Sequence, residues 1–315
     1  MKVVVTGATG HIGAYVSGRL SGAGWEVVAA SRSGQMPRVA FEAAAGRGNV
    51  RPLALDLSSE TALDVLGREL GPDVAVVHLA GWHPPATAAS TPADRGRLIE
   101  VNVMGTLRLL DAVRQSSGAR IVVYASTFEV YGIPAEGPVT EAAPTRPFSD
   151  YGATKVAGED HLFAFSTEQG LPVVALRMPA IYGPGEHVSR ALPNFLRAVA
   201  RGERPKIYGD GLDRRDELHA SDAALGIECA LASTRSEVYN LADGEPHSVF
   251  DLARTALAVA GLGGEPELLP ARKKRFDFHM SIDKIRTELG FEPRVRLAEG
   301  MAQQLRWLRR AEASG

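Results

Sequence analysis

The chain has 315 residues, of which 45% are hydrophobic, and its formal net charge at pH 7 is −2. A nearly neutral chain of this kind has no electrostatic footprint for nucleic acid or for an anionic membrane surface. Its single cysteine, Cys229, excludes an internal disulfide and a multi-cysteine zinc site, and we expect no metal site. The apolar runs are shorter than the roughly 20 residues that a membrane span needs, and we expect a cytoplasmic protein.

Short apolar runs alternate with stretches of helical periodicity through the first half of the chain. The apolar runs are rich in Val, Ile, Leu and Ala and end in turn residues, which predicts buried strands. These strands are expected at Lys2–Thr6, Glu26–Ala30, Leu53–Asp56, Val74–Leu79, Arg120–Ala125 and Val173–Arg177. Helices are expected at Leu98–Arg114 and Tyr151–Glu168, and a helix with its exit loop at Val39–Arg51. This alternation predicts an α/β fold with a doubly wound parallel sheet.

The pattern changes after about Tyr182. Clusters of glycine and proline punctuate shorter elements at 183–185, 202–205, 209–213, 242–246 and 261–266. We therefore predict a sheet domain over residues 1–182 and a smaller C-terminal α/β substrate lobe over residues 183–315. Some segments of the second part are expected to return to the first domain.

A glycine-rich turn, Gly7–Gly13, follows the first predicted strand and opens a helix. Small residues are needed where a chain turns tightly, lets its backbone approach a pyrophosphate and packs helix against strand. The helix N-terminus adds free N–H groups and a partial positive charge. We therefore predict a Rossmann-type domain that binds NAD or NADP through Gly7, Gly10, His11, Ile12 and Gly13. A purely structural turn is the alternative in a chain with 33 glycines.

The second predicted strand leads into Ser31 and Arg32. An NAD-selective site usually has a carboxylate at this position, whereas an arginine suits the 2′-phosphate of NADP. We therefore predict a preference for NADP over NAD, with a solvated loop arginine as the alternative. Further cofactor contacts are expected near the tips of other strands, at Asp56, Leu57, Leu79, Ala80, Gly81 and Pro179.

Tyr151 and Lys155 are four residues apart at the start of a predicted helix, so their side chains share one face. An unperturbed phenol titrates near ~10 and is a poor base at neutral pH. A neighbouring ammonium, together with an oxidised nicotinamide, is predicted to lower the pKa of Tyr151. An incidental pair on an amphipathic helix is the alternative. The glycine turn upstream favours an acid–base pair for hydride chemistry.

Together these features resemble the extended short-chain dehydrogenase/reductase family, and within it the nucleotide-sugar epimerases, dehydratases and decarboxylases. The resemblance covers nearly the whole chain. Besides the glycine turn and the Tyr151/Lys155 pair, it is carried by the segments His78–Ala80, Val101–Thr106, Ala125–Gly132, Leu176–Gly185, Tyr208–Asp216 and Leu289–Pro293. The resemblance implies a nucleotide-sugar or related carbonyl substrate and a homodimer formed through the helices before and around Tyr151.

The same resemblance implies roles for individual residues. Thr127 would complete a catalytic triad with Tyr151 and Lys155 and bond the reacting sugar oxygen. Lys155 would also bond the nicotinamide ribose, and Asn102 would help to order the central helix. Arg215 would grip the substrate diphosphate, which suits the charge-assisted, bidentate bonds of arginine.

The alternative for Arg215 is a surface ion pair with Asp216 or Glu217. His83, in the loop Trp82–Pro85, is expected to face the substrate and contact a sugar hydroxyl, or else to be an ordinary loop histidine. The basic run 272–275 would cover the diphosphate or be solvated.

Glu129 stands where related dehydratases and decarboxylases carry a glutamate beside the triad. It would serve as a second acid or base at a neighbouring sugar carbon, or support the site by hydrogen bonding. Two positions depart from the family pattern. Phe128 replaces a polar residue that the dehydratases usually have there, which argues against 4,6-dehydration. Ala180 replaces an asparagine that contacts the substrate diphosphate in sugar-nucleotide enzymes.

The first hypothesis is an epimerase. Tyr151 would remove a hydroxyl proton as hydride passes to the nicotinamide, and the keto-sugar would rotate and take the hydride back on its other face. The second hypothesis is an NADP(H)-dependent ketoreductase of a sugar or another carbonyl compound, which Arg32 and Ala180 favour. A sugar dehydratase or decarboxylase is less favoured. A non-catalytic nucleotide-binding regulator is disfavoured because Thr127, Tyr151 and Lys155 are all present.

Overall fold

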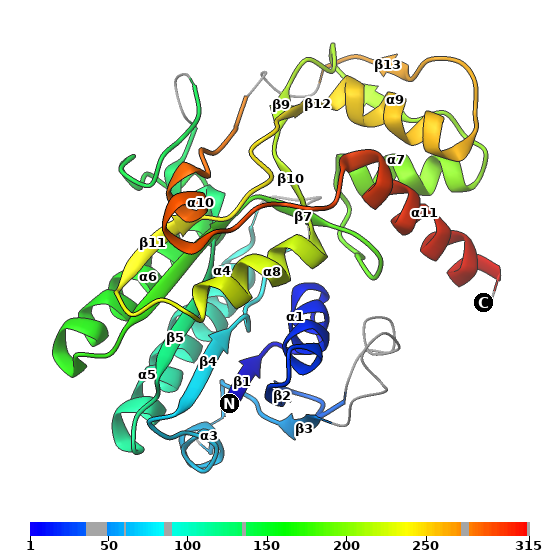
Figure 1. Ribbon diagram of the computed structural model, residues 1–315. Coiled ribbons are helices and arrows are strands. Elements are labelled where there is room, and N and C mark those ends of the chain that lie inside the picture. Colours follow the sequence, from blue (N-terminus) through cyan, green and yellow to red (C-terminus); the bar gives the residue numbers. More distant parts are fainter. Residues whose placement is uncertain (36–48, 60, 85–89, 134–136, 272–276, 314–315) are drawn as a thin grey trace.

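The computed structural model describes residues 1–35, 49–59, 61–84, 90–133, 137–271 and 277–313 (Figure 1). Within these residues, seven parallel strands form one sheet in the order β11-β6-β5-β4-β1-β2-β3. The strands are β1 (Lys2–Thr6), β2 (Glu26–Ser31), β3 (Val50–Ala54), β4 (Val74–His78), β5 (Ile121–Thr127), β6 (Val173–Met178) and β11 (Glu237–Asn240). The predicted doubly wound parallel sheet is confirmed.

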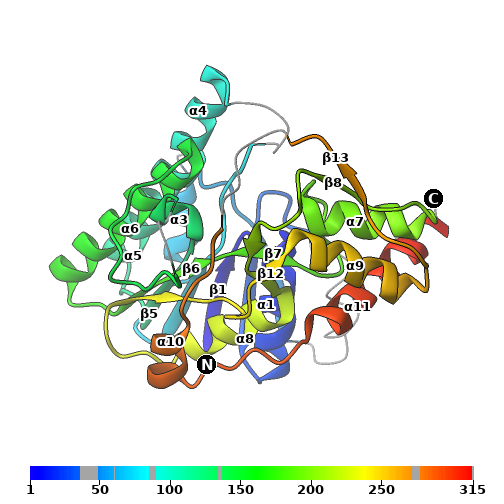
Figure 2. The same ribbon diagram turned by 90° about the horizontal axis from the view of Figure 1, so that it is seen from above.

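Helices cover both faces of this sheet, as Figures 1 and 2 show. On one face α1 (His11–Gly22) packs against α8 (Ala220–Ala230). The other face carries α3 (Ala62–Gly67), α5 (Gly105–Gln115) and α6 (Asp150–Gln169). Strands β4 and β6 are buried along their whole length, which explains why they are continuous apolar runs without alternation.

The strand order reverses between β1 and β4. Strand β1 pairs with β2 on one side and with β4 on the other, so the connections leave it in opposite directions. In sheets of this type a crevice opens at the carboxyl ends of the strands where the order reverses, and ligands bind there. The fold therefore directs the glycine turn after β1 and the tip of β4 to the same crevice.

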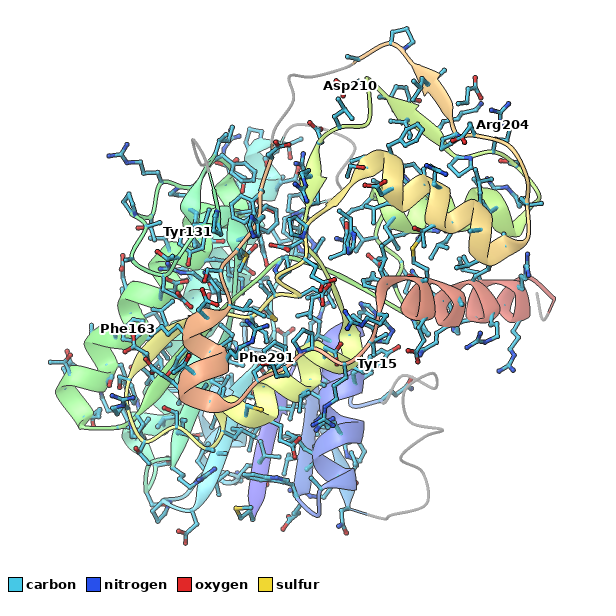
Figure 3. All side chains as sticks on the ribbon, turned by 45° about the horizontal axis from the view of Figure 1, so that its top comes forward. Tyr15, Tyr131, Phe163, Arg204, Asp210 and Phe291 are labelled. Carbon is cyan, nitrogen blue, oxygen red and sulfur yellow. The ribbon has the colours of Figure 1, made fainter. Side chains whose placement is uncertain are left out.

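A smaller layer lies beside the sheet and has its own apolar core, which includes Leu196, Ile207 and Leu252. It is built from α7 (Ala191–Ala200), α9 (Val249–Ala260), α11 (Leu297–Ala313) and the parallel pair β8 (Lys206–Tyr208) and β13 (Glu267–Leu269). Arg204 precedes β8 and Asp210 follows it, and both lie at the edge of this layer that is far from the sheet (Figure 3). None of the helices in the described ranges is long and apolar enough to cross a bilayer.

Short elements join the two parts. Strand β7 (Ala180–Tyr182) pairs with β10 (Glu217–His219), and β9 (Arg214–Arg215) pairs with β12 (His247–Ser248). The helix α10 (Asp283–Leu289) packs beside β11. Because α8 and β11 belong to the sheet layer, the chain after residue 182 passes back and forth between the layers. A domain division at residues 182/183 stays a prediction.

The third strand differs from its predicted position at Leu53–Asp56. It runs from Val50 to Ala54, and the carboxylate of Asp56 accepts bonds from the backbone N–H and the hydroxyl of Ser58, a local turn that ends the strand. Assigning Val50 and Arg51 to a helix exit loop was therefore wrong, and residues 36–48 of that predicted segment lie outside the described residues. Pro52 is tolerated because β3 is an edge strand.

The single helix predicted over Leu98–Arg114 is divided into three segments. Helix α4 (Pro92–Leu98) ends at Leu98, a π-helical segment η1 (Ile99–Met104) follows, and α5 begins at Gly105. Such π-helical turns occur mostly as short interruptions of α-helices, often at functional sites. Here the wider turn contains Asn102, whose side chain is buried and fully engaged with neighbouring segments, as described below.

Candidate active site

The glycine turn after β1 leaves room where side chains would not fit. Gly7 has a φ of +68°, and a Cβ at this position would lie 2.7 Å from the backbone nitrogen of Ala80. A Cβ on Gly13 would lie 2.2 Å from the carbonyl oxygen of Gly7. Gly10 caps α1 without a side-chain hydrogen bond, so the first turn of the helix can offer its N–H groups to an anion. The residues present therefore fit a dinucleotide pyrophosphate.

His11 begins α1 and lies against the loop that follows β7. Its ring meets that of Tyr15 edge-on at 5.6 Å, and the Tyr15 hydroxyl donates to the carbonyl of Pro184 at 3.0 Å (Figure 3). Burial, with a further contribution from the charge of Arg190, lowers the pKa of His11 to about 4. The histidine is therefore neutral at physiological pH and adds no charge to the helix N-terminus.

The tips of β2 and β3 bring the predicted adenosine-side residues together. Ser31 is buried and its hydroxyl donates to the carbonyl of Gln35 at 3.3 Å, whereas Arg32 is exposed. Hydrogen bonds from Ser58 lower the pKa of the Asp56 carboxyl, and the positive charge of Arg32 acts in the same direction. This end of the crevice thus carries an accessible guanidinium next to a carboxylate.

The remaining predicted cofactor residues lie at other strand ends. Leu57 is buried, and Pro179 is buried between β6 and β7. Leu79 and Ala80 follow β4 and touch the glycine turn, as the close approach to Gly7 shows. A Cβ built on Gly81 would lie 3.5 Å from the ammonium of Lys155, so Gly81 passes directly beside the predicted acid–base pair.

Tyr151 and Lys155 project from the first turns of α6 towards the end of β5. The Lys155 ammonium is buried, donates to the carbonyl of Ala125 at 2.8 Å and lies 5.8 Å from the centre of the Tyr151 ring. It also lies 4.7 Å from the centre of the Tyr124 ring. Thr127 ends β5, and its hydroxyl accepts the N–H of Glu129 at 3.4 Å. The three residues of the predicted triad thus stand at the carboxyl end of β5 and in the first turns of α6.

Burial dominates the ionisation of this pair. It lowers the pKa of Lys155 to about 8, against the attraction of Glu159. It also raises the pKa of the Tyr151 phenol, and the negative charge of Glu129 raises it further. Without a bound cofactor the groups of the protein therefore raise the phenol pKa. The predicted lowering, which includes the charge of an oxidised nicotinamide, stays a prediction.

Glu129 belongs to the 3₁₀ turn η2 (Phe128–Tyr131) and connects three elements. One carboxylate oxygen accepts a hydrogen bond from the Ser149 hydroxyl, which caps α6 by accepting the N–H of Gly152 at 2.9 Å. The other oxygen lies 3.7 Å from Nε2 of His83, whose ring is 4.6 Å from that of Tyr151. Ser149 was missed at the sequence level, although a serine just before a helical stretch is a recognisable N-cap signal.

Asn102 holds the loop that carries His83. Its side-chain oxygen accepts the N–H of Trp82 at 2.7 Å, and its amide donates to the carbonyl of Trp82 at 3.0 Å and to the hydroxyl of Thr154 at 3.1 Å. Both backbone groups of Trp82 are therefore satisfied by one side chain. The contact with Thr154 links this loop and η1 to the helix that carries Tyr151.

One turn after Lys155, a buried ion pair crosses from α6 to β6. Glu159 receives two hydrogen bonds from Nε of Arg177 at 3.0 and 3.2 Å and one from Nη2 at 2.6 Å. The Ser126 hydroxyl donates to the same carboxylate. Because Ser126 precedes Thr127, this network fixes α6 to the catalytic end of β5.

The structure shows what surrounds Phe128 and Ala180, the two residues that depart from the family pattern. The Phe128 ring packs against Phe278 at 4.8 Å and faces Phe148 at 6.1 Å, so an aromatic cluster occupies this position. Ala180 begins β7 and pairs with Glu217 of β10. No carboxyl or amide stands at residues 128 and 180 themselves.

Arg215 lies in β9, opposite His247 of β12. Its guanidinium donates to the carbonyl of Arg214 at 2.9 Å and lies 3.4 Å from the carboxylate of Asp213. The alternative of an ion pair between Arg215 and Asp216 or Glu217 was wrong, because Arg215 pairs with Asp213 instead. The Asp216 carboxylate accepts the N–H of Met280 at 2.6 Å, and the Glu217 carboxylate lies 3.9 Å from Arg190.

The strand with Arg215 is close to the catalytic end of β5. The carbonyl of Arg214 accepts the N–H of Phe278, and the ring of Phe278 packs on Phe128. Strand β9 is therefore linked through Phe278 to the η2 turn that follows β5. The basic run 272–275, expected to cover the diphosphate, lies outside the described residues.

Comparisons with known proteins agree with this geometry. The family model described as "NAD dependent epimerase/dehydratase family" matches residues 3–242. A dTDP-glucose 4,6-dehydratase of Streptomyces griseus is 35% identical over 97% of this chain and 93% of the relative. A UDP-glucose 4-epimerase of Mycolicibacterium smegmatis is 28% identical over 98% of this chain and 99% of its own.

Among solved structures, MoeE5 in complex with UDP-glucuronic acid and NAD is 32% identical, with a TM-score of 0.84 over 99% of this chain and 100% of its own. The relatives thus carry out different reactions on nucleotide sugars, and their likeness does not decide between dehydration and epimerisation. Three findings lead to one conclusion: a family match over most of the chain, a glycine turn directly after β1, and the placement of Tyr151 and Lys155 on α6 beside the end of β5. The chain belongs to the NAD-dependent epimerase/dehydratase family of enzymes, within the extended short-chain dehydrogenases/reductases.

Proposed function

We propose that this enzyme is a nucleotide-sugar epimerase that works through a transient keto-sugar. The observation that carries the proposal is the aromatic packing of Phe128. A dehydratase must protonate a departing hydroxyl in addition to exchanging a proton and a hydride at one carbon. The position before Glu129 holds a ring and cannot supply that proton. Tyr151 and Lys155, by contrast, suffice for reversible oxidation at a single carbon.

The proposed roles follow from the contacts. Tyr151 takes the proton of the reacting hydroxyl and returns it, and the Thr127 hydroxyl bonds the same oxygen. Lys155, held by the carbonyl of Ala125, positions the nicotinamide ribose and keeps a positive charge beside the phenol. A bound nicotinamide supplies the hydride acceptor and donor, and its positive charge when oxidised offsets the burial that raises the pKa of Tyr151.

Product analysis tests the proposal. The protein is incubated with NAD and, separately, with UDP-glucose, dTDP-glucose and UDP-glucuronic acid, and products are identified by mass spectrometry and NMR. We expect a sugar epimer of unchanged mass, without deuterium at carbon when the reaction runs in D₂O, since the hydrogen moves only between sugar and cofactor. A product that has lost water or carbon dioxide would overturn the proposal. Deuterium at a neighbouring carbon would assign Glu129 as a second base.

Arg215 is proposed to bind the substrate diphosphate, in place of the contact that Ala180 lacks. Arg215→Ala is expected to weaken the binding of free UDP by on the order of 1.5–3 kcal/mol, because a charge-assisted contact is lost. Affinity for the dinucleotide should not change. Isothermal titration calorimetry measures both, with Arg214→Ala as the matched control, since Arg214 is an exposed neighbour that donates to the carbonyl of Pro246. Equal UDP affinity in the Arg215 variant and the wild type would exclude the diphosphate role.

An NADP(H)-dependent ketoreductase is the second candidate, and the exposed Arg32 at the tip of β2 favours it. We propose that Arg32 pairs with the 2′-phosphate, so that NADP(H) binds more tightly than NAD(H). Arg32→Ala should remove most of this preference and spare NAD affinity. Because the contact is near the surface, the preference should also fall as salt rises. Fluorescence titration of both cofactors decides the matter. Tighter NAD binding by the wild type would leave the epimerase as the better candidate.

We further propose that the protein forms a homodimer through the helices around η1. Segment η1 exposes two apolar side chains, Ile99 at 54% and Met104 at 37%, and it packs beside α5 and α6. A second copy would remove these side chains from water. Light scattering on the purified protein would then give twice the chain mass of 33.5 kDa.

A further inference from the structure

His83 occupies a position between two groups that the proposed chemistry depends on. Its ring packs on Tyr151 at a centroid distance of 4.6 Å, with an angle of 61° between the ring planes. Its Nε2 lies 3.7 Å from a carboxylate oxygen of Glu129. Asn102 binds both backbone groups of Trp82 and so holds the backbone directly before His83.

Both ring nitrogens of His83 face oxygen acceptors. Nδ1 lies 2.5 Å from the carbonyl oxygen of Pro84, which can only accept, and Nε2 faces the carboxylate of Glu129. A neutral imidazole has one N–H and can serve only one of them. The imidazolium has two: Nδ1 donates to the carbonyl of Pro84, and Nε2 presents an N–H and a positive charge to the Glu129 carboxylate at 3.7 Å. The two acceptors therefore favour the charged form of His83.

The surrounding charges act in the same overall direction. Glu129 is the main reason that the pKa of His83 lies above its usual value, and the Pro84 carbonyl adds to this, while burial and the charge of Arg190 oppose it. Around Tyr151, Glu129 raises the phenol pKa, and the Lys155 ammonium lies 5.8 Å from the centre of the phenol ring. Asp150, next to Tyr151, lies 3.9 Å from Arg95 of α4, which offsets its charge.

We propose that His83 is a positioning residue for proton transfer at Tyr151: as an imidazolium it orients Glu129 and offsets its negative charge. Through this contact the phenol ionises at a lower pH than it would beside an uncompensated Glu129. His83 keeps its proton throughout, and only Tyr151 exchanges one with the substrate. This inference rests on the proposed function, because it takes Tyr151 to be the base.

The first experiment needs no turnover. The imidazole of His83 is titrated by NMR, its signal being the one that is missing in His83→Gln. In Glu129→Gln, whose amide oxygen still accepts from Ser149, the pKa of His83 should fall relative to the wild type, by about 0.5–1 pH unit. His161→Gln, on the exposed side of α6, serves as a matched control and should leave the His83 titration unchanged. An unchanged His83 pKa in Glu129→Gln would overturn the proposal, even if the enzyme proves to be an epimerase.

The second experiment is a double-mutant cycle on the pH dependence of kcat. His83→Gln should move the rising limb to higher pH by about 0.5–1 unit, since Glu129 is then uncompensated, and Glu129→Gln should move it to lower pH. In the double variant, His83→Gln should add nothing to the effect of Glu129→Gln. Additive shifts would show that His83 acts on its own, for example on a sugar hydroxyl, and would overturn the proposed coupling. A lack of turnover on every nucleotide sugar would count against the proposed function while the NMR result still stands.

Discussion

Tyr151→Phe is expected to reduce kcat by roughly 10²–10⁴-fold on any substrate that the enzyme turns over, because the phenol is the group that exchanges the proton. The fold should be unaffected. The phenyl ring still packs against His83, and Lys155 keeps its bond to the carbonyl of Ala125. The cofactor affinity should also stay close to that of the wild type, since the glycine turn and the strand tips are unchanged.

Steady-state kinetics and a cofactor titration on the same preparation measure these two effects. Tyr239→Phe is the matched control, since it removes another tyrosine hydroxyl, one that donates to Glu288 at 2.8 Å. That variant should retain activity. The direction in which activity changes with pH can also be predicted. Burial and Glu129 raise the pKa of Tyr151, so activity in the wild type should rise as pH increases towards the alkaline side. Near-normal turnover by Tyr151→Phe would remove this residue from the chemistry.

Glu159→Ala should have the largest effect on stability, a loss of about 3–5 kcal/mol in the free energy of unfolding. The Glu159 and Arg177 side chains are 5% and 7% exposed, so the substitution leaves a guanidinium charge buried without its carboxylate. The Ser126 hydroxyl also loses its acceptor. Replacing only one partner of a buried pair is costly because water cannot reach the charge that remains.

Urea denaturation followed by circular dichroism measures the loss. Glu168→Ala provides the comparison on the same helix, because Glu168 pairs with Arg114 at 2.7 Å but is 59% exposed. An exposed pair is worth at most about 1 kcal/mol. If both variants lose the same small amount of unfolding free energy, the buried pair does not stabilise the packing of α6 against β6.

The features that were predictable from sequence are local ones. The glycine turn is contained in seven residues, and its steric demand follows from residue type and from its place after an apolar run. Tyr151 and Lys155 share a face because four residues make about one helical turn. The alternation of strands and helices predicts the α/β architecture, because each buried parallel strand is a continuous apolar run in the sequence. Strand β3 was misplaced because Arg51 and Pro52 interrupt such a run, which only an edge strand tolerates.

What the tertiary structure decided concerns pairs that are distant in the chain. Glu129 meets Ser149 and His83, Asn102 binds the backbone of Trp82, and these partners come from different loops and helices. No spacing rule connects such residues, because their approach depends on how α6 and η1 pack beside the end of β5. The direction of the Tyr151 pKa shift was also decided by the tertiary structure. The sequence shows a lysine four residues away, which favours the phenolate. Only the folded chain shows that the phenol is withdrawn from water and that Glu129 lies near it, and both of these raise its pKa.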